Sequence, residues 1–177
     1  GKTTLMRLMY FDLLPDAGRV KVNGFSSKSM TNRKIPKARK MIGMVFQDYK
    51  LLDDRNLFEN VALPLHVLGY SAREIPERVE EALELVGLEG KDHHFPNELS
   101  GGEQQRACLA RAIIKEPDIV LADEPTGNLD PVASFELVRL LETIHETGTT
   151  ILMASHNYNL IKGRGRPIYE LKDGILR

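Results

Sequence analysis

The first four residues of the chain have the types and the spacing of a loop that holds phosphate. They are Gly1, Lys2, Thr3 and Thr4, and residues with helical spacing follow them directly. The tetrapeptide matches the end of the motif G-x-x-x-x-G-K-[ST], in which backbone N–H groups cradle phosphates, the lysine reaches the outer ones and the next hydroxyl binds Mg²⁺. Lys2 and Thr3 would have those two roles. An exposed lysine at a helix start is also common without any ligand, so the tetrapeptide alone is a weak signal.

Two carboxylates follow an apolar run in the last third of the chain. Residues 119–122 are Ile, Val, Leu and Ala, which favours a buried strand, and Asp123 and Glu124 come directly after them. A buried parallel strand delivers side chains to the crevice outside its carboxyl end. There Asp123 would hold magnesium through water, and Glu124, on the opposite face, would polarise an attacking water. The alternative is that both carboxylates belong to a helix-capping turn.

A serine and two glycines upstream form a second pattern that suits an anion. In the segment LSGGEQQR, Ser100 is a good helix N-cap, and Gly101 and Gly102 let an anion approach the backbone N–H groups. The helix dipole adds partial positive charge at that end. A capping box of Ser100 with Glu103 would explain those two residues but neither the paired glycines nor the polar run after them. The pattern predicts a second phosphate site in the same domain.

The composition excludes several other classes of protein. The chain has 177 residues, enough for one domain with a substantial core, and 42% hydrophobic with 28% charged residues is typical of a globular protein. With 24 Lys and Arg against 25 Asp and Glu, the charge balance favours neither nucleic acid nor an anionic membrane surface as a partner. No apolar run is long enough to cross a bilayer, and the single cysteine, Cys108, excludes an intrachain disulfide and fits a reducing compartment. No metal-ligand spacing links the histidines His66, His93, His94 and His145.

Helices and strands must position these groups, and the hydrophobic pattern predicts where they lie. Apolar spacing predicts helices over 3–14 and from Asp130 onward, and strands over 19–22, 41–46, 118–123 and 149–154. The order strand, helix, strand in the last third indicates a parallel crossover. Continuous apolar strands are expected when helices cover both faces of a sheet, so the fold class is α/β.

The middle of the chain is predicted to be mostly helical. Asn56 with Glu59, and Ser71 with Glu74, each place a capping oxygen three residues before a carboxylate, which is the spacing of a capping box at a helix start. An apolar stripe follows the second pair and ends at Gly87. This region would form a lobe inserted in the α/β core.

The octapeptide LSGGEQQR, followed by a strand that ends in ADEPTGNLD, resembles the ATP-binding-cassette (ABC) ATPase family. The resemblance extends over essentially the whole chain. It implies a single ABC ATPase domain over 1–177, with a P-loop NTPase core, a mostly parallel RecA-like sheet and a helical subdomain at about 48–98. It also implies ATP and Mg²⁺ as cofactors, hydrolysis of ATP, and a head-to-tail homodimer in which the serine of one subunit closes over the nucleotide of the other.

Carried over by position, the resemblance assigns roles to further residues. Gln47 matches the Q-loop glutamine that contacts magnesium and water, His156 matches the switch histidine that contacts the γ-phosphate, and Asp130 lies in the D-loop that crosses between subunits. The implied catalytic residues are Glu124, His156 and Gln47, and the implied metal-binding residues are Thr3, Gln47 and Asp123. The implied nucleotide-binding residues are Gly1, Lys2, Thr3, Thr4, Ser100, Gly101, Gly102, Gln104 and Asp130.

The stretch GMVFQDYKLLDDRNLFENVALPL narrows the resemblance to the branch of the family that includes ATPases of cell division, lipoprotein release and macrolide export. This branch implies an integral-membrane partner and a cytoplasmic position, peripheral on the inner face of the cell membrane, without direct contact to nucleic acid. Two other classes stay open. One is a soluble cassette that acts on nucleic acid or the ribosome, and the other is a nucleotide-binding regulatory module without turnover.

The sequence departs from the family pattern at two places. Asn157 follows the switch histidine, where the family commonly has an acidic residue, and we expect a modest effect. The chain also begins at Gly1 without an initiator methionine, the first loop glycines or the strands that precede them in the family. We therefore expect the sequence to be the later part of a longer protein and to bind ATP poorly by itself.

Overall fold

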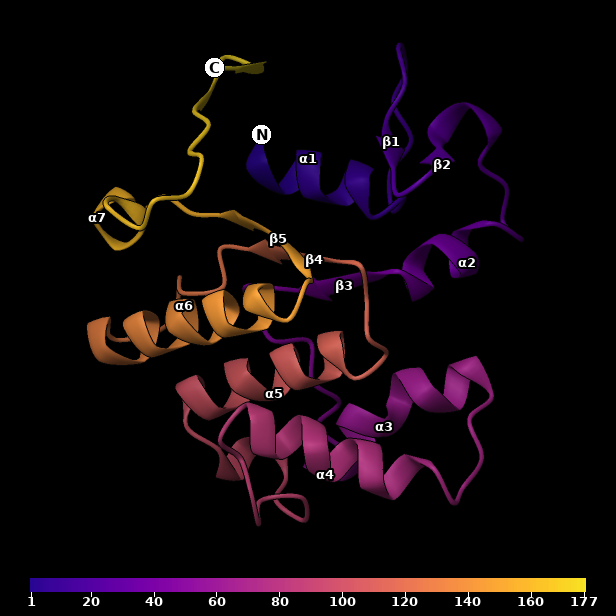
Figure 1. Ribbon diagram of the computed structural model, residues 1–177, viewed down its shortest axis with the longest axis vertical. Helices are drawn as coiled ribbons and strands as arrows, with labels where there is room; N and C mark the ends of the chain where they lie inside the picture. The colour runs from indigo at the N-terminus through magenta and orange to yellow at the C-terminus, as the bar shows by residue number, and fades with distance from the viewer.

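A parallel sheet of three strands forms the centre of the computed structural model, which describes residues 1–177 (Figure 1). The strands are β3 (Ile42–Val45), β4 (Ile119–Asp123) and β5 (Thr150–Ala154), in that order across the sheet. Their register pairs Val45 with Ala122 and Asp123 with Ala154. The carboxyl ends of all three strands therefore meet at one edge of the sheet.

Helices cover both faces of this sheet. α5 (Gly101–Ile113) and α6 (Pro131–Glu146) pack on one face, and α1 (Lys2–Met9) packs on the other (Figure 1). Alternate residues of β4 divide between the faces, since Val120 lies in the apolar cluster with α5 and α6, whereas Leu121 lies in the cluster with α1. Burial on both sides explains why the strands are apolar along their length. The predicted α/β fold is confirmed.

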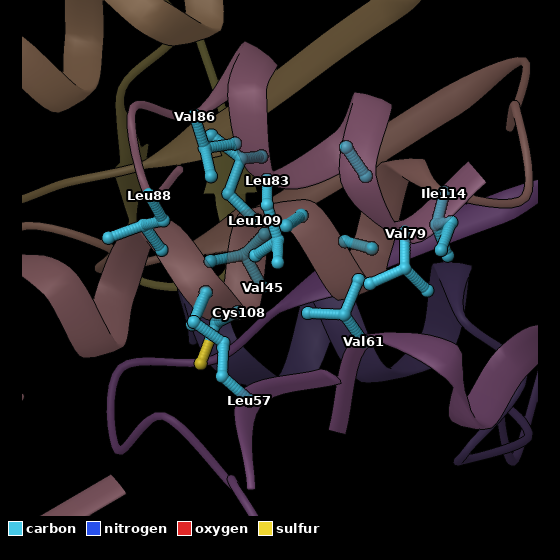
Figure 2. Packing of buried hydrophobic residues seen from close by; sticks show 14 of the residues in the cluster. Val45, Leu57, Val61, Val79, Leu83, Val86, Leu88, Cys108, Leu109 and Ile114 are labelled. Carbon is cyan, nitrogen blue, oxygen red and sulfur yellow. The ribbon is translucent and has the colours of Figure 1, made fainter. Parts of the chain in front are cut away.

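The larger apolar cluster joins α5 to two further helices, α3 (Leu57–Leu68) and α4 (Ile75–Leu85). We call α3, α4 and α5 the helical layer. Val61 of α3, Val79 of α4 and Leu109 of α5 meet inside it and are at most 1% exposed (Figure 2). Burying one such side chain fully contributes about 1.5–3 kcal/mol, so this contact holds the layer together.

The two predicted capping boxes have different outcomes. At the start of α3, Glu59 N–H donates to Asn56 Oδ1 at 2.9 Å, and Asn56 N–H donates to Glu59 Oε2 at 3.1 Å, as predicted. At the second position, Ser71 N–H and O–H donate to Glu74 Oε2 at 3.0 and 2.6 Å, but α4 begins only after Glu74. The second pair thus stabilises the turn that precedes a helix.

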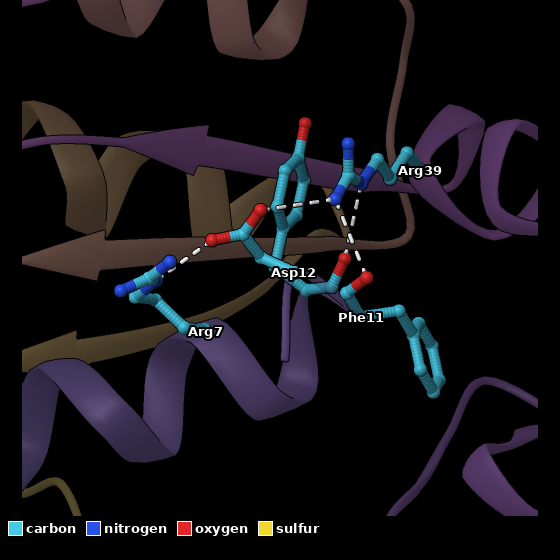
Figure 3. A network of polar contacts seen from close by, with 5 residues as sticks. Arg7, Phe11, Asp12 and Arg39 are labelled. Carbon is cyan, nitrogen blue, oxygen red and sulfur yellow. Dashed lines mark hydrogen bonds and ion pairs between the residues drawn. The ribbon is translucent and has the colours of Figure 1, made fainter. Parts of the chain in front are cut away.

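α1 ends sooner than the hydrophobic pattern predicts. Phe11 has a φ of 55°, a left-handed conformation that a right-handed helix cannot contain. Arg39, from α2 (Ile35–Lys40), donates to two carbonyl oxygens at the helix end, at 3.2 and 3.3 Å (Figure 3). Asp12 accepts from Arg7 at 2.7 Å and from Arg39 at 3.4 Å. Contacts with a later segment therefore determine where α1 stops.

The remaining elements are short. They are β1 (Lys21–Val22) antiparallel to β2 (Phe25–Ser26), β6 (Leu171–Lys172) antiparallel to β7 (Ile175–Leu176), the 3₁₀ turns η1 (Ser27–Ser29) and η2 (Pro96–Glu98), and α7 (Tyr158–Ile161). None of the helices has the length and apolar character needed to cross a bilayer.

Candidate functional site

The candidate site lies where the carboxyl edge of the sheet meets the start of α1. Lys2 Nζ is 3.1 Å from Glu124 Oε1. The other carboxylate oxygen of Glu124 accepts a hydrogen bond from His156 N–H at 3.0 Å and lies 2.8 Å from His156 Nδ1. Because a carboxylate oxygen only accepts, Nδ1 carries the hydrogen in this contact. Three predicted residues from distant parts of the sequence thus form one cluster.

The backbone directs Glu124 into this cluster. β4 ends one residue earlier, and Glu124 has a φ of 47°, a strained conformation for a residue with a side chain. Its carboxylate is only 11% exposed. Burial raises the pKa of Glu124, but hydrogen bonds from Lys2 and His156 outweigh burial and hold the pKa below its usual value. The side chain is therefore ionised at neutral pH and can accept a hydrogen bond from a water molecule.

Asp123 has the environment expected of a residue that faces a cation. The residue is 7% exposed, and its buried Oδ1 has no hydrogen-bond partner. A buried carboxylate oxygen is rarely left unpaired unless an ion or water completes it. Residues 1–177 contain no group of three His, Cys, Asp or Glu side chains that could hold a metal by themselves. A single carboxylate suits Mg²⁺, which retains water and takes its other ligands from phosphates.

The start of α1 offers backbone N–H groups to an anion. Gly1 is the N-cap residue, and no side chain caps the helix. Its first turn contains Thr3 and Thr4, both exposed, and no acidic residue. The first N–H groups of a helix lack partners inside the helix, and the helix dipole makes this end partly positive. This end of α1, with Lys2 beside it, could therefore hold an anion.

The start of α5 contains the capping box that the sequence left as an alternative. Glu103 Oε2 accepts from Ser100 N–H at 2.8 Å and from Ser100 O–H at 2.7 Å, and Lys91 forms an ion pair with Glu103. The hydrogen bond from Lys91, followed by those from Ser100, lowers the pKa of Glu103 to about 2. Gln104 Nε2 donates to the carbonyl of Leu99 at 3.0 Å. The box holds the turn in which Gly101 and Gly102 lie.

Gln47 and Asp130 lie at the turns beside these elements. Gln47 O accepts a hydrogen bond from Asn128 Nδ2 at 3.1 Å, and a β-carbon built on Gly127 would lie 3.0 Å from Gln47 Nε2. Asp130 Oδ1 caps α6, since it accepts from Val132 N–H at 2.8 Å and from the next N–H at 3.0 Å. The glycine allows the Gln47 amide to lie close to the turn that follows Glu124.

The predicted residues thus fall into separate groups. No hydrogen bond or ion pair joins Ser100 or Gln104 to Lys2 or Glu124. A cavity of about 400 Å³ lies between His156 and the start of α6, and Gly127 and Ser134 also line it. The groups at α1 and at α5 are not joined directly, and we call them the two half-sites.

Sequence reasoning missed three residues that contact this region. They are Tyr49, Cys108 and Arg111, of which the last two lie on α5 and hydrogen-bond to the segment after Gln47. Their spacing of three residues places them on the same side of α5, which was the available signal. Nothing in the local sequence indicated which segment that side faces.

Residues 1–127 match the ABC transporter family. The chain therefore belongs to the ABC transporter family, whose nucleotide-binding subunits bind and hydrolyse ATP. The family and the ATPase activity predicted from the sequence are confirmed. Among solved structures, it is similar to the dimeric, post-hydrolysis cassette MJ0796 bound to ADP and Pi, with a TM-score of 0.80 and 34% identity over 90% of this chain and 72% of that one. It is similar also to cbiO1 of Clostridium perfringens, with a TM-score of 0.80 and 31% identity over 91% of this chain and 64% of that one.

Several similar sequences belong to one kind of ABC protein. The chain is 46% identical to the cell division ATP-binding protein FtsE of Streptococcus pneumoniae, over 98% of this chain and 76% of that protein. It is also 46% identical to FtsE of Mycobacterium tuberculosis, over 99% and 76%, and to FtsE of Escherichia coli, over 99% and 79%. The predicted branch of the family is confirmed by these similarities.

Proposed function

We propose that this protein is the ATP-hydrolysing subunit of a membrane complex that acts in cell division, as the name of its FtsE relatives indicates. The observation that carries the proposal is the cluster of Lys2, Glu124 and His156 at the carboxyl edge of the sheet. A cation that can hold phosphate, an ionised carboxylate that can orient water and an imidazole that can stabilise phosphate charge are together suited to phosphoryl transfer to water.

ATP would bind with its phosphates at the start of α1. The N–H groups that follow Gly1 would hold the β-phosphate, and Lys2 would reach the γ-phosphate. Lys2 would then leave its ion pair with Glu124, now 3.1 Å long, and contact a phosphate oxygen instead. When bound, Mg²⁺ would neutralise phosphate charge, and Thr3, Gln47 and Asp123 are the residues that would hold it. The unpaired Oδ1 of Asp123 supports this assignment.

Hydrolysis would depend on the carboxylate released by Lys2. Glu124 would accept a hydrogen from the attacking water and orient it toward the γ-phosphate, and Gln47 would contact the same water. His156, whose side chain is 70% exposed, would stabilise charge on the phosphate. The existing contact between His156 and Glu124 keeps both side chains at the same point of the sheet edge.

The half-site at α5 would act on the nucleotide of a second subunit in a head-to-tail homodimer. Ser100, Gly101, Gly102 and Gln104 would approach its γ-phosphate, and Asp130 would lie at the subunit boundary. The dimeric state of the MJ0796 cassette supports this arrangement. Because ATP would contact both subunits, it would bind the closed dimer more tightly than the open one, and hydrolysis would remove that difference.

Residues 48–98 would act as the helical subdomain that transmits dimer closure to a membrane partner. The packing of α3 against α4 in one apolar cluster supports movement of these two helices together. The partner would be an integral-membrane protein such as FtsX, and the ATPase would lie on the inner face of the membrane. An ATPase of the LolD or MacB kind, which serves lipoprotein release or export, is the alternative within the family, and a soluble cassette acting on nucleic acid or the ribosome is the alternative outside it.

The substitution Glu124→Gln tests the catalytic assignment in the full-length protein assembled with its membrane partner. We expect ATP binding to remain and steady-state phosphate release to fall at least about 100-fold, because an amide cannot take the proton of water. The matched control is Glu136→Gln, on the exposed side of α6, which should hydrolyse ATP at the normal rate. Unchanged phosphate release by Glu124→Gln would show that the carboxylate is not the catalytic base.

Identification of the membrane partner tests the cellular role. Recovery of FtsX with the full-length protein from solubilised membranes is the expected result. Recovery of a lipoprotein-releasing or macrolide-exporting membrane protein would assign the chain to the LolD or MacB kind instead. Salt-dependent binding to DNA or to ribosomes, with no membrane partner, would favour the soluble class.

A further inference from the structure

The segment that follows β3 is held in a strained conformation by α5. Tyr49 and Lys50 have φ values of 57° and 55°, so two successive residues with side chains are left-handed. Arg111 donates to both of their carbonyl oxygens, at 2.8 Å to Tyr49 O and 2.6 Å to Lys50 O. The buried thiol of Cys108 also donates to Tyr49 O, at 2.8 Å. These bonds join the segment to the second half of α5.

The side chain of Tyr49 reaches the opposite end of the same helix. A β-carbon built on Gly101, the first residue of α5, would lie 2.9 Å from the Tyr49 hydroxyl oxygen. Cys108 lies seven positions after Gly101, which corresponds to about 10 Å along a helix. Tyr49 therefore lies along half of α5, from its carbonyl at Cys108 to its hydroxyl at Gly101. The absence of a side chain at Gly101 leaves room for the hydroxyl.

Tyr49 thus lies between the Gln47 segment, to which its backbone belongs, and the start of α5, which its hydroxyl approaches. Gln47, two residues before it, lies against Gly127 and Asn128 in the turn that follows Glu124. Gly101, at the other end, directly follows the N-cap Ser100. In the dimer of the proposed function, Gln47 serves the nucleotide of its own subunit and Ser100 serves the nucleotide of the partner.

We propose that Tyr49 is a positioning residue that couples the two nucleotide sites of the dimer. The inference rests on the proposed function. A shift of Gln47 toward its nucleotide moves the backbone of Tyr49, and the hydroxyl end moves the turn at Gly101 that faces the other nucleotide. Because Cys108 and Arg111 bond to the carbonyls of Tyr49 and Lys50, a shift of this backbone is passed on to α5. Occupation of one site thereby raises the affinity of the other.

The test is the ATP dependence of hydrolysis by the full-length protein assembled with its membrane partner. We expect the wild type to be cooperative and Tyr49→Ala to give a Hill coefficient close to 1. The matched control is Tyr70→Ala, which removes another half-buried tyrosine that packs against the helical layer and contacts neither half-site. Its Hill coefficient should equal that of the wild type, because lost packing alone does not uncouple the sites.

A second measurement tests the contact itself. Gly101→Ala places a methyl group 2.9 Å from the Tyr49 hydroxyl and should reduce hydrolysis. Adding Tyr49→Phe removes that hydroxyl, so the double variant should hydrolyse ATP several-fold faster than Gly101→Ala alone. A double variant no faster than the single one would overturn the proposed contact.

The outcomes separate this inference from the proposed function. A wild type that hydrolyses ATP cooperatively, with a Tyr49→Ala variant that is equally cooperative, overturns the inference and leaves the proposed function intact. A wild type with a Hill coefficient of 1 also overturns the inference alone. A wild type that does not hydrolyse ATP with its partner overturns the proposed function, and the inference fails with it.

Discussion

Two buried polar side chains, Asn60 in the helical layer and Asp123 at the sheet edge, have opposite surroundings. Asn60 is fully buried, and its amide is saturated: Oδ1 accepts from Leu52 N–H at 2.8 Å, and Nδ2 lies 3.0 Å from the carbonyls of Leu52, Arg55 and Asn56. Asp123 is 7% exposed, and its buried Oδ1 has no partner.

This difference distinguishes a polar group that stabilises the fold from one that is left free to bind a ligand. Leaving a buried polar atom unpaired lowers stability by about 1–3 kcal/mol, so a fold tolerates it where something other than the fold requires it. The sheet edge shows a second sign of the same kind, the left-handed backbone of Glu124. In the helical layer the Asn60 amide of α3 is satisfied, whereas Gln105 of α5, which donates to Phe46 O just after β3, has a buried Oε1 without a partner. The contrast is therefore between α3 and the groups beside the sheet.

The largest effect on stability is expected where a saturated group is removed. Asn60→Leu keeps the volume but leaves the Leu52 N–H and several carbonyls without a partner, so the free energy of unfolding should fall by about 1–3 kcal/mol or more. Asp123→Asn breaks no hydrogen bond and replaces a buried, unpaired charge with a neutral amide, so it should not lower the free energy of unfolding, while it weakens Mg²⁺-dependent hydrolysis. Urea denaturation of both variants measures the difference. Equal losses of stability would remove the distinction between the two regions.

What the sequence could predict depends on whether a feature is local or joins distant segments. The anion patterns at Lys2 and Ser100, the strand before Asp123 and the cap at Asn56 are local, because residue type and spacing determine them. Contacts between distant segments have no local pattern. The pairing of Lys2 with Glu124 and the contact of Arg111 with Tyr49 depend on how the elements pack, as does the early end of α1.

A smaller effect, dependent on pH, is expected at the start of α5, where the two regions meet. Glu103 has a pKa of about 2 instead of 4.5, first because of Lys91 and then because of Ser100. A lowered pKa stabilises the fold fully above 4.5, and the stabilisation is lost as the pH falls from 4.5 to about 2. The stability difference between the wild type and Glu103→Gln should therefore shrink across that interval.

Urea denaturation at successive pH values measures this difference. Glu80→Gln, at an exposed carboxylate of α4 that forms no ion pair, is the matched control and should run parallel to the wild type. A difference between the wild type and Glu103→Gln that stays constant down to a pH of about 2 would mean that Glu103 owes its effect to packing rather than charge.

The smallest effect is expected at the cap of α3, the helix that carries the saturated Asn60. Asn56→Ala leaves the Glu59 N–H without its acceptor, and loss of such a cap lowers the free energy of unfolding by about 1 kcal/mol. Asn32→Ala, in an exposed turn, should change it by less than about 0.5 kcal/mol. Because the cap lies in the helical layer and not at the sheet edge, Asn56→Ala should leave the affinity for ATP unchanged. Weaker ATP binding by this variant, at a temperature where it is fully folded, would show that the stability of the layer reaches the nucleotide site directly.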